Sequence, residues 1–293
     1  LDQVAGEEAT GEDRALIRER LGLDRSLGGQ CFSWLTGVFQ GDFGVSLRQH
    51  RPVADILSEA VGPTLLLTVT AYLFHLLLAV VAALVMVLFA GRPLARWVNG
   101  VGLTLYSLPS FWLGLMLIML LARQLGWFPA GGMQAPDAAF LDWGPRIRDL
   151  IGHLVLPVAT LALGSFMGTA RYLRSALAEV LDQDHILAAR SRGLPERTVL
   201  VRHALRNALL PVITLAGLSL PALLGGAVVV EVVFGWPGMG RVTLEAIWAR
   251  DYPVIMATTL VAAVTVVTGS LLADLLYHWA DPRVRLAGTG DET

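Results

Sequence analysis

The chain has 293 residues, of which 55% are hydrophobic and only 16% are charged. Soluble domains carry about a quarter charged residues, so this composition is typical of a membrane protein. The chain contains no lysine and a single cysteine, Cys31, which excludes a phosphate-binding P-loop, Schiff-base chemistry and an internal disulfide. The net charge of −2 gives no general attraction for nucleic acid, so we expect no nucleic-acid partner.

The first segment, residues 1–59, is polar and is predicted to form a head outside the membrane. The sequence begins at Leu1, without an initiator methionine or a signal peptide. We therefore expect that a first membrane span precedes this head in the complete protein.

Five apolar stretches follow the head, and each is long enough to cross a bilayer, which takes about 20 residues. They predict an all-α polytopic membrane protein with a transmembrane domain over residues 60–280. The predicted spans are about 62–90, 98–122, 152–174, 208–233 and 253–277. Pro109, Pro157 and Pro221 are candidate kink positions within or beside these spans. Gly164 and Gly168, four residues apart, favour a close approach of helices.

The arginines near the span ends predict the orientation of the chain. When the long head is set aside, 11 arginines fall on one side of the membrane and five on the other. Because basic residues near spans collect on the cytoplasmic side, the loop 175–206 and the tail 281–293 are predicted to be cytoplasmic. The head then faces outward.

The cytoplasmic loop 175–206 has the pattern of a helix, a break and a second helix. Gly193 is expected to end the first helix, and Pro195 suits the first turn of the next. Ala188 and Ala189 are small enough for another surface to approach closely. We interpret this segment as a short helix on the inner face of the membrane that docks a partner protein.

Ionisable residues inside spans are functional hypotheses, because burying them in lipid is costly. Glu231 either lines the transport path or holds a neighbouring loop, and Asp274 is expected at the interface or paired with an arginine. His75 is expected to be a neutral histidine that is hydrogen-bonded to a partner helix. The histidines lack metal-ligand spacing, and no polar cluster suggests catalysis, so we expect no catalytic, metal or cofactor site on this chain.

Several motifs resemble the dipeptide/oligopeptide/nickel permease family of ABC importers. They are "LPSFWLG" (108–114), "HLVLPVATLAL" (153–163), "ARSRGLPERTVLVRHALRNALLPVIT" (189–214), "GGAVVVEVVFGWPGMGR" (225–241), "ARDYPVI" (249–255) and "DPRVR" (281–285). Ala188, Ala189 and Gly193 match an "EAA---G" coupling-loop signature, in which Leu187 replaces the glutamate. The likeness covers nearly the whole chain.

This resemblance implies the transmembrane domain of a type I ABC importer in the inner membrane of a bacterium. Such a chain is not an enzyme. It forms half of a translocation pathway together with a second permease, receives solute from an extracytoplasmic substrate-binding protein, and docks one of two cytoplasmic ABC ATPases that hydrolyse ATP–Mg. Small peptides are the expected solute. The alternatives are nickel or another small solute within the same family, and an ion-coupled secondary transporter from a different class.

Two groups of site residues follow. The expected docking residues are Leu187, Ala188, Ala189, Arg190, Ser191, Arg192, Gly193 and Leu194, with Arg190 and Arg192 pairing with acids of the ATPase or with anionic lipid. The expected pathway or gate residues are Glu231, Trp236, Pro237 and Gly238, in a compact turn at the outer end of the fourth predicted span.

Overall fold

The computed structural model describes residues 26–209 and 227–280 of the chain. Within these residues the protein is helical and contains no strand, apart from an isolated bridge between Val45 and Pro52. The predicted all-α class is confirmed. The first part of the head, the tail 281–293, Pro221 and most of the predicted span 208–233 lie outside the described residues.

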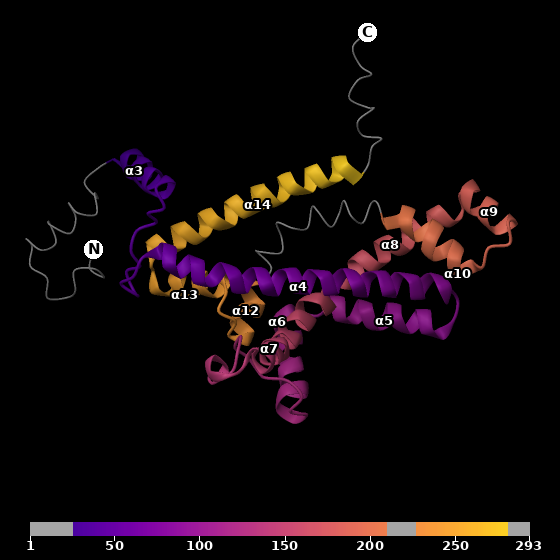
Figure 1. Cartoon of the computed structure of the whole chain (residues 1–293), viewed down its shortest axis with the longest axis horizontal. Coiled ribbons are helices and arrows are strands. Elements are labelled where there is room, and N and C mark those ends of the chain that lie inside the picture. Colours follow the sequence, from indigo (N-terminus) through magenta and orange to yellow (C-terminus); the bar gives the residue numbers. More distant parts are fainter. Residues whose placement is uncertain (1–25, 210–226, 281–293) are drawn as a thin grey trace, which may run out of the picture.

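The longest helix, α4 (Val53–Leu88), is the axis of the fold and contains nearly all of the predicted span 62–90. Its 36 residues extend for about 54 Å, which is more than a bilayer core requires. A tight turn with Gly91 at a φ of 78° reverses the chain. Helix α5 (Pro93–Ser107) then runs back along α4 (Figure 1).

The second predicted span, 98–122, is not one straight helix. Helix α5 ends at Ser107, and α6 (Ser110–Leu117), which continues as the π-helix η1 (Ile118–Gln124), leaves at a bend of 108°. The cause lies at Pro109, because the residue before a proline is disfavoured in the helical conformation. Accordingly, Leu108 is extended, with φ −81° and ψ 139°.

The third predicted span is also broken. Helix α7 (Trp143–Leu163), preceded by the short 3-10 turn η2 (Ala138–Phe140), begins well before residue 152 and continues through Pro157. It meets α8 (Phe166–Leu181) at a bend of 51° over Gly164 and Ser165. The break therefore lies at a glycine–serine pair and not at the candidate proline.

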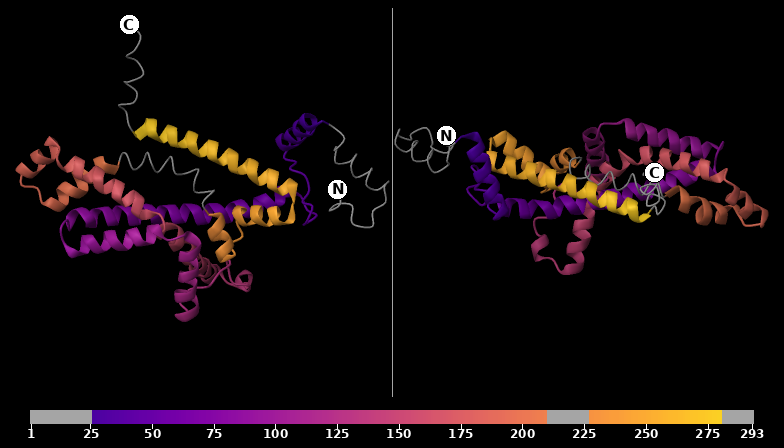
Figure 2. Two further views of the ribbon diagram at one scale, coloured as in Figure 1. Left: turned by 180° about the vertical axis from the view of Figure 1, so that it is seen from behind. Right: turned by 90° about the horizontal axis from the view of Figure 1, so that it is seen from above.

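The arginine-rich segment lies at one end of α4, and helices from the head and from the segment after residue 227 lie at the other end. Helix α8 leads to α9 (Asp184–Ser191), α10 (Glu196–Thr198) and the π-helix η3 (Val199–Ala204) at one end. Helices α3 (Leu27–Phe39) and α13 (Met239–Ala249) lie at the other end, with α12 (Val228–Phe234) leading into α13 (Figures 1 and 2). Helix α14 (Tyr252–Ala280) starts beside the first turn of α4 and diverges from it.

Close packing along α4 relies on small residues, as expected where lipid removes the hydrophobic drive between helices. Ala79, Ala82 and Ala83 are buried against α8 and its neighbours. On α5, a Cβ at Gly102 would lie 2.6 Å from the sulfur of Met167 on α8, so a larger residue there would require the side chains of α8 to shift.

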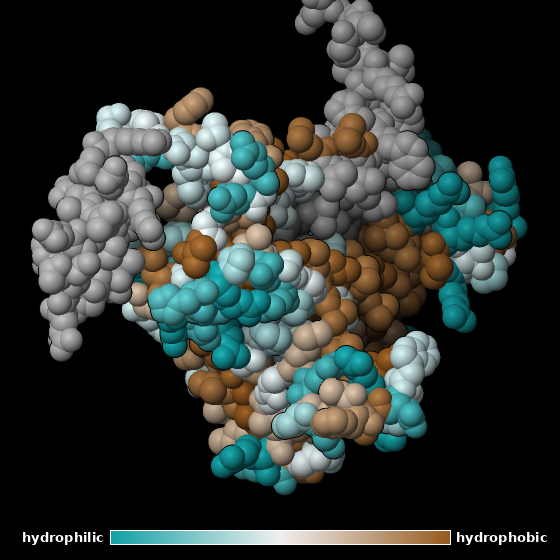
Figure 3. Space-filling model, turned by 60° about the vertical axis from the view of Figure 1, so that its left-hand side comes forward, coloured by the Kyte–Doolittle hydropathy of each residue, from teal (hydrophilic) through white to brown (hydrophobic). Residues whose placement is uncertain are grey.

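Much of the apolar surface faces outward. Figure 3 shows a brown apolar belt between teal polar regions. In the described part of the chain, α4 and the segment Tyr252–Leu271 of α14 are long and apolar enough to cross a membrane, and each of the two bent pairs is a further candidate span.

Candidate functional site: the arginine-rich helix and the buried glutamate

The predicted docking segment forms α9, which packs on α8 and η3. Ile186 and Ala189 are buried in a cluster that includes Leu177 and Leu200. The helix ends where Gly193 adopts a φ of 75° and donates its N–H to the carbonyl of Arg190 at 2.9 Å. Gly193 therefore ends the helix as the sequence predicted, because a left-handed conformation is cheap only for glycine.

The two alanines of the signature have different environments. Ala189 is only 5% exposed and faces its own subunit, whereas Ala188 is exposed. The expectation that both alanines offer a surface to a partner therefore needs revision for Ala189, which fixes α9 onto α8 and η3. Leu187, which is 55% exposed, and Leu194, which is 37% exposed, are the apolar side chains that α9 and its following turn present outward.

Arg190 is held by its own subunit. Its guanidinium donates to both carboxylate oxygens of Glu196, at 3.2 Å from Nε and 2.6 Å from Nη2, and so bridges the turn at Gly193. These hydrogen bonds lower the pKa of Glu196 from its usual value. The ion pair therefore persists at neutral pH and is lost only as pH falls through that lowered value. Of the two predicted external contacts, Arg190 thus has an internal partner, while Arg192 is exposed.

Glu231, on α12, is fully buried and caps a neighbouring helix. Its carboxylate accepts a hydrogen bond from the hydroxyl of Thr64 on α4 at 2.7 Å and from the backbone N–H of Arg241 at 3.0 Å. Thr64 in turn accepts from the N–H of Met239, the first residue of α13, at 2.8 Å. Glu231 and Thr64 together satisfy two of the unpaired donors at the start of α13, where negative charge is favoured.

The glycines of "GWPGMGR" are required for this contact. A Cβ on Gly238 would overlap the carboxylate of Glu231, and a Cβ on Gly240 would lie 2.7 Å from the Cα of Val228. Gly235 caps α12 in the left-handed region, with a φ of 61°. The turn is compact because each of these three positions excludes a side chain or prefers glycine.

Trp236 and Arg241 anchor the same turn from two sides. The indole N–H of Trp236, whose side chain is completely buried, donates to the carbonyl of Pro63 on α4 at 2.9 Å. Arg241 donates to the carbonyl of Gly235 at 2.9 Å and to Glu245 at 2.8 Å. Of the four predicted gate residues, Glu231, Trp236 and Gly238 are therefore packed inside this structure, and Pro237 is exposed.

A second buried carboxylate, Asp251, was not singled out by sequence. It accepts from the hydroxyl of Ser46 at 2.5 Å and from the backbone N–H groups of Leu47 and Arg48 at 3.1 and 3.3 Å. These bonds tie the turn before α4 to the start of α14. In the sequence, Asp251 is simply an acidic residue before a Tyr-Pro pair. Such a pattern is too common to predict this contact.

His75, at the middle of α4, is hydrogen-bonded across to another helix, as expected. Its Nδ1 lies 2.8 Å from the hydroxyl of Ser165, and its Nε2 lies 3.0 Å from that of Thr169. Gly168 lies between these two residues. A Cβ added to it would lie 3.5 Å from the ring of Tyr106 on α5. The close approach at Gly168 is therefore made within the chain.

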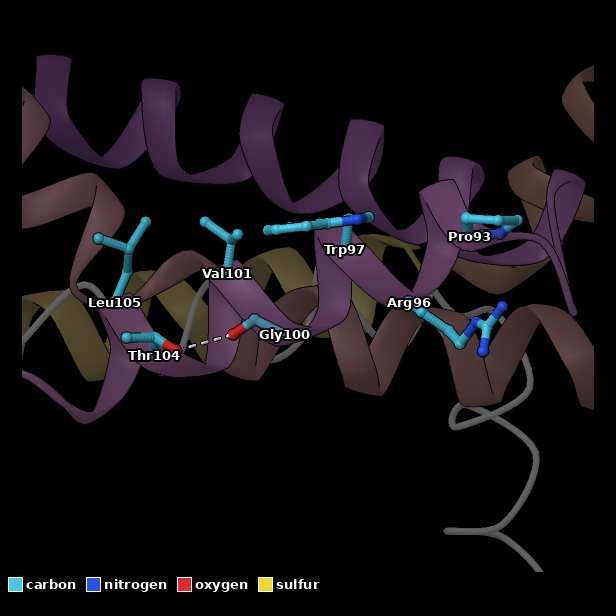
Figure 4. Close-up of a pocket in the computed structure, with 7 residues that line it drawn as sticks. All are labelled: Pro93, Arg96, Trp97, Gly100, Val101, Thr104 and Leu105. Carbon is cyan, nitrogen blue, oxygen red and sulfur yellow. Dashed lines mark hydrogen bonds between the residues drawn. The ribbon is translucent and has the colours of Figure 1, made fainter.

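The outward face of α5 carries a shallow depression of about 580 Å³ (Figure 4). It is lined by Pro93, Arg96, Trp97, Gly100, Val101, Thr104 and Leu105. The hydroxyl of Thr104 donates to the carbonyl of Gly100 at 3.0 Å, so it is already used within the helix. Since a single helix supplies every lining residue, this surface is a helix face and not a built site. Among the described residues, no group of three metal-ligating side chains comes together.

Comparison with known proteins identifies the family. A family described as "Binding-protein-dependent transport system inner membrane component" matches residues 75–286. The oligopeptide transport system permease protein AppB of Bacillus subtilis (strain 168) is 43% identical over 276 residues, which cover 93% of this chain and 85% of that protein. The glutathione transport system permease protein GsiC of Escherichia coli (strain K12) is 35% identical over 282 residues, with 96% and 87% covered.

Two solved structures share the fold. The MetNI methionine ABC transporter in an inward-facing conformation superposes with a TM-score of 0.61 at 18% identity, covering 77% of this chain and 96% of that one. An amino acid ABC transporter with histidines gives 0.57 at 19% identity, covering 76% and 94%. The broken helices and the long α4 thus belong to a fold seen in ABC importers. The chain belongs to the family of binding-protein-dependent transport system inner membrane components, and it is a permease subunit of an ABC importer.

Proposed function

We propose that this permease carries small peptides into the cell. The observation that carries the proposal is the 43% identity with the oligopeptide permease AppB, which extends over 93% of the chain. The relative GsiC is named for glutathione, itself a small peptide. Family membership sets aside the ion-coupled secondary transporter. Nickel or another small solute remains the second candidate, on the resemblance to the wider peptide and nickel branch.

Energy for transport comes from ATPases on separate chains. The chain contains no lysine and so has no P-loop of its own. In our proposal, α9 and the turn at Gly193 dock into a groove of one cytoplasmic ATPase, and a second permease with its own ATPase completes the pathway. Leu187, Ala188 and Leu194 supply the contact, because they are the apolar or small residues that face outward there. Arg192 adds charge at the edge of this surface.

The outer end of the chain receives solute from an extracytoplasmic binding protein. This assignment rests on the arginine distribution and on the placement of α9 and of α3 and α13 at opposite ends of α4 (Figure 1). The head then faces outward and the C-terminus is cytoplasmic. Glu231, Trp236, Pro237 and Gly238 hold the outer turn, and we propose that this turn moves as a unit when the pathway opens.

Uptake assays in a strain that lacks the gene test the solute. Labelled di- and tripeptides are expected to enter only when the gene is restored, and unlabelled peptides are expected to compete. Labelled nickel, measured in the same cells, is expected to enter equally with and without the gene. Gene-dependent nickel uptake without peptide uptake would replace peptides by nickel as the proposed solute.

A further inference from the structure

One cavity lies between the centre of α4 and the two helix breaks, α5–α6 and α7–α8. This cavity has a volume of about 590 Å³, which is within the range of small-molecule sites. Its wall comes from α4 (Thr68, Ala71, Tyr72, His75), from the break between α5 and α6 (Tyr106, Leu108, Ser110) and from the break between α7 and α8 (Thr160, Leu161, Gly164, Ser165, Gly168, Thr169). Irregular backbone at membrane depth is tolerated where it lines such a cavity.

The wall presents a mostly apolar surface that carries several polar side chains and no formal charge. Eight of its thirteen residues have a hydroxyl or an imidazole, and none is Asp, Glu, Lys or Arg. The hydroxyls of Thr68, Thr160 and Ser165 donate to carbonyls of their own helices, at 2.8, 2.8 and 2.7 Å. Each of these hydroxyls donates its proton to the backbone, and Thr68 and Thr160 are buried, so these hydroxyls belong to the packing of the wall.

His75 is fixed in one orientation by this arrangement. Because the Ser165 proton is used on Leu161, Ser165 accepts from the Nδ1–H of His75. In the neutral ring, Nε2 then accepts from the hydroxyl of Thr169. Neither ring nitrogen is left for a metal ion. The ring of Tyr72 stacks on His75, with centroids 5.9 Å apart and planes 7° from parallel, so the two form a flat, fixed wall.

Tyr72 supplies a hydroxyl in this wall that has no hydrogen-bond partner among the described residues. The oxygen of this hydroxyl is buried. Buried polar groups are normally paired, and an orphaned one calls for a ligand or another explanation. A phenolic O–H in the wall of a cavity of this size is suited to donate to a carbonyl oxygen.

We infer that this cavity binds the uncharged amide backbone of a peptide in transit. The Tyr72 hydroxyl donates to a peptide carbonyl, and the hydroxyls of half-buried Ser110 and exposed Tyr106 in the same wall bind the other polar groups of the peptide backbone. A bare or hydrated metal cation finds no charged ligand here. This inference rests on the proposed peptide transport and names the groups that recognise the solute.

Tyr72→Phe tests the inference in the complete importer, reconstituted with its permease partner, ATPases and binding protein. Loss of one hydrogen bond to the solute is expected to raise the KM for uptake of di- and trialanine by about 3- to 10-fold, with kcat little changed. The hydroxyl has no partner within the described chain, so removing it is expected to leave assembly and thermal stability unchanged. Tyr252→Phe, the same change at an exposed position on α14, is the matched control and is expected to leave KM unaltered.

Thiol labelling provides a second measurement. In a Cys31→Ser background, Ser110→Cys places a thiol in the cavity wall. Saturating trialanine is expected to slow the labelling of this thiol by at least about 5-fold, because the peptide then occupies most of the sites. Free alanine and nickel are expected to leave the labelling rate unchanged. An unchanged KM in Tyr72→Phe, or labelling insensitive to peptide, overturns the inference while the wild type still imports peptide. If the wild type imports no peptide, it is the proposed function that fails.

A different occupant gives a different pattern. If a helix of the partner permease or a lipid chain fills the cavity, Ser110→Cys stays unreactive at every peptide concentration. Tyr72→Phe would then alter assembly of the permease pair and leave KM unchanged. That result also overturns the inference.

Discussion

At the scale of single residues, a carboxylate inside a span is explained here by hydrogen bonding rather than by catalysis. Glu231 accepts hydrogen bonds from two donors, the Thr64 hydroxyl and the backbone N–H of Arg241 near the start of α13. This arrangement reduces the cost of burying the charge without placing a cationic side chain beside it. The same contact explains why the turn after α12 is rich in glycine.

Gly238→Ala is predicted to destabilise the protein. The added methyl group overlaps the Glu231 carboxylate, so the turn or α12 must shift, at a cost of about 1–3 kcal/mol. The loss is measurable as a lower thermal midpoint of the purified protein in detergent. Gly100→Ala on α5, where nothing lies within 4 Å of the new Cβ, is the control and is expected to be neutral or stabilising. Equal effects of the two substitutions would contradict the proposed packing.

At the scale of elements, α9 is a helix with an inner and an outer side. Ala189 faces inward, and Ala188 faces outward, so the same substitution at the two positions separates folding from docking. The ion pair between Arg190 and Glu196 bridges the turn at Gly193.

Ala188→Trp is expected to abolish ATPase recruitment and uptake, while the protein still inserts and folds. Ala189→Trp is expected to lower the stability of the protein itself, because the larger side chain overpacks a buried cluster. Such overpacking lowers the free energy of unfolding by about 1–3 kcal/mol or more. Ala178→Trp, at an exposed site on α8, is the matched control. Co-purification of the ATPases measures recruitment, and normal recruitment by Ala188→Trp would remove α9 from the docking surface.

Gly193→Ala is predicted to weaken coupling less than Ala188→Trp does. No atom lies within 4 Å of the added Cβ, so the cost is the left-handed backbone alone, roughly 1 kcal/mol. Gly193→Pro is expected to abolish uptake, because proline cannot adopt a φ of 75°. ATPase activity stimulated by the binding protein reports both effects, and unaltered stimulation in Gly193→Pro would contradict the role of this turn.

Much of the element pattern could be predicted from sequence, since apolar length and the turn residues Gly91, Pro93 and Gly193 are local signals. The bend at Pro109 was a candidate for the same reason. The break at Gly164 and Ser165 was not predicted, because a glycine–serine pair permits a kink without requiring one; in the structure Ser165 contacts His75 on α4. The inward direction of Ala189 and the pairing of Ser46 with Asp251 likewise depend on distant residues.

At the scale of the whole molecule, the inner and outer segments are separated by the length of α4 (Figure 1). Asp137→Cys and Arg197→Cys, each in a Cys31→Ser background, are predicted to react with a membrane-impermeant thiol reagent from opposite sides. Asp137→Cys is expected to label in intact cells, and Arg197→Cys only after permeabilisation, because in our proposal the arginine-rich loop is cytoplasmic. The reverse pattern would invert the proposed orientation.

The central claim is that this chain moves solute only with energy from a partner ATPase. The most direct measurement is peptide uptake into proteoliposomes that contain the chain and its permease partner, with or without the two ATPases. We predict uptake that requires the ATPases, ATP and the binding protein, and that is insensitive to collapse of ion gradients. Uptake driven by an ion gradient with the ATPases omitted would contradict the account.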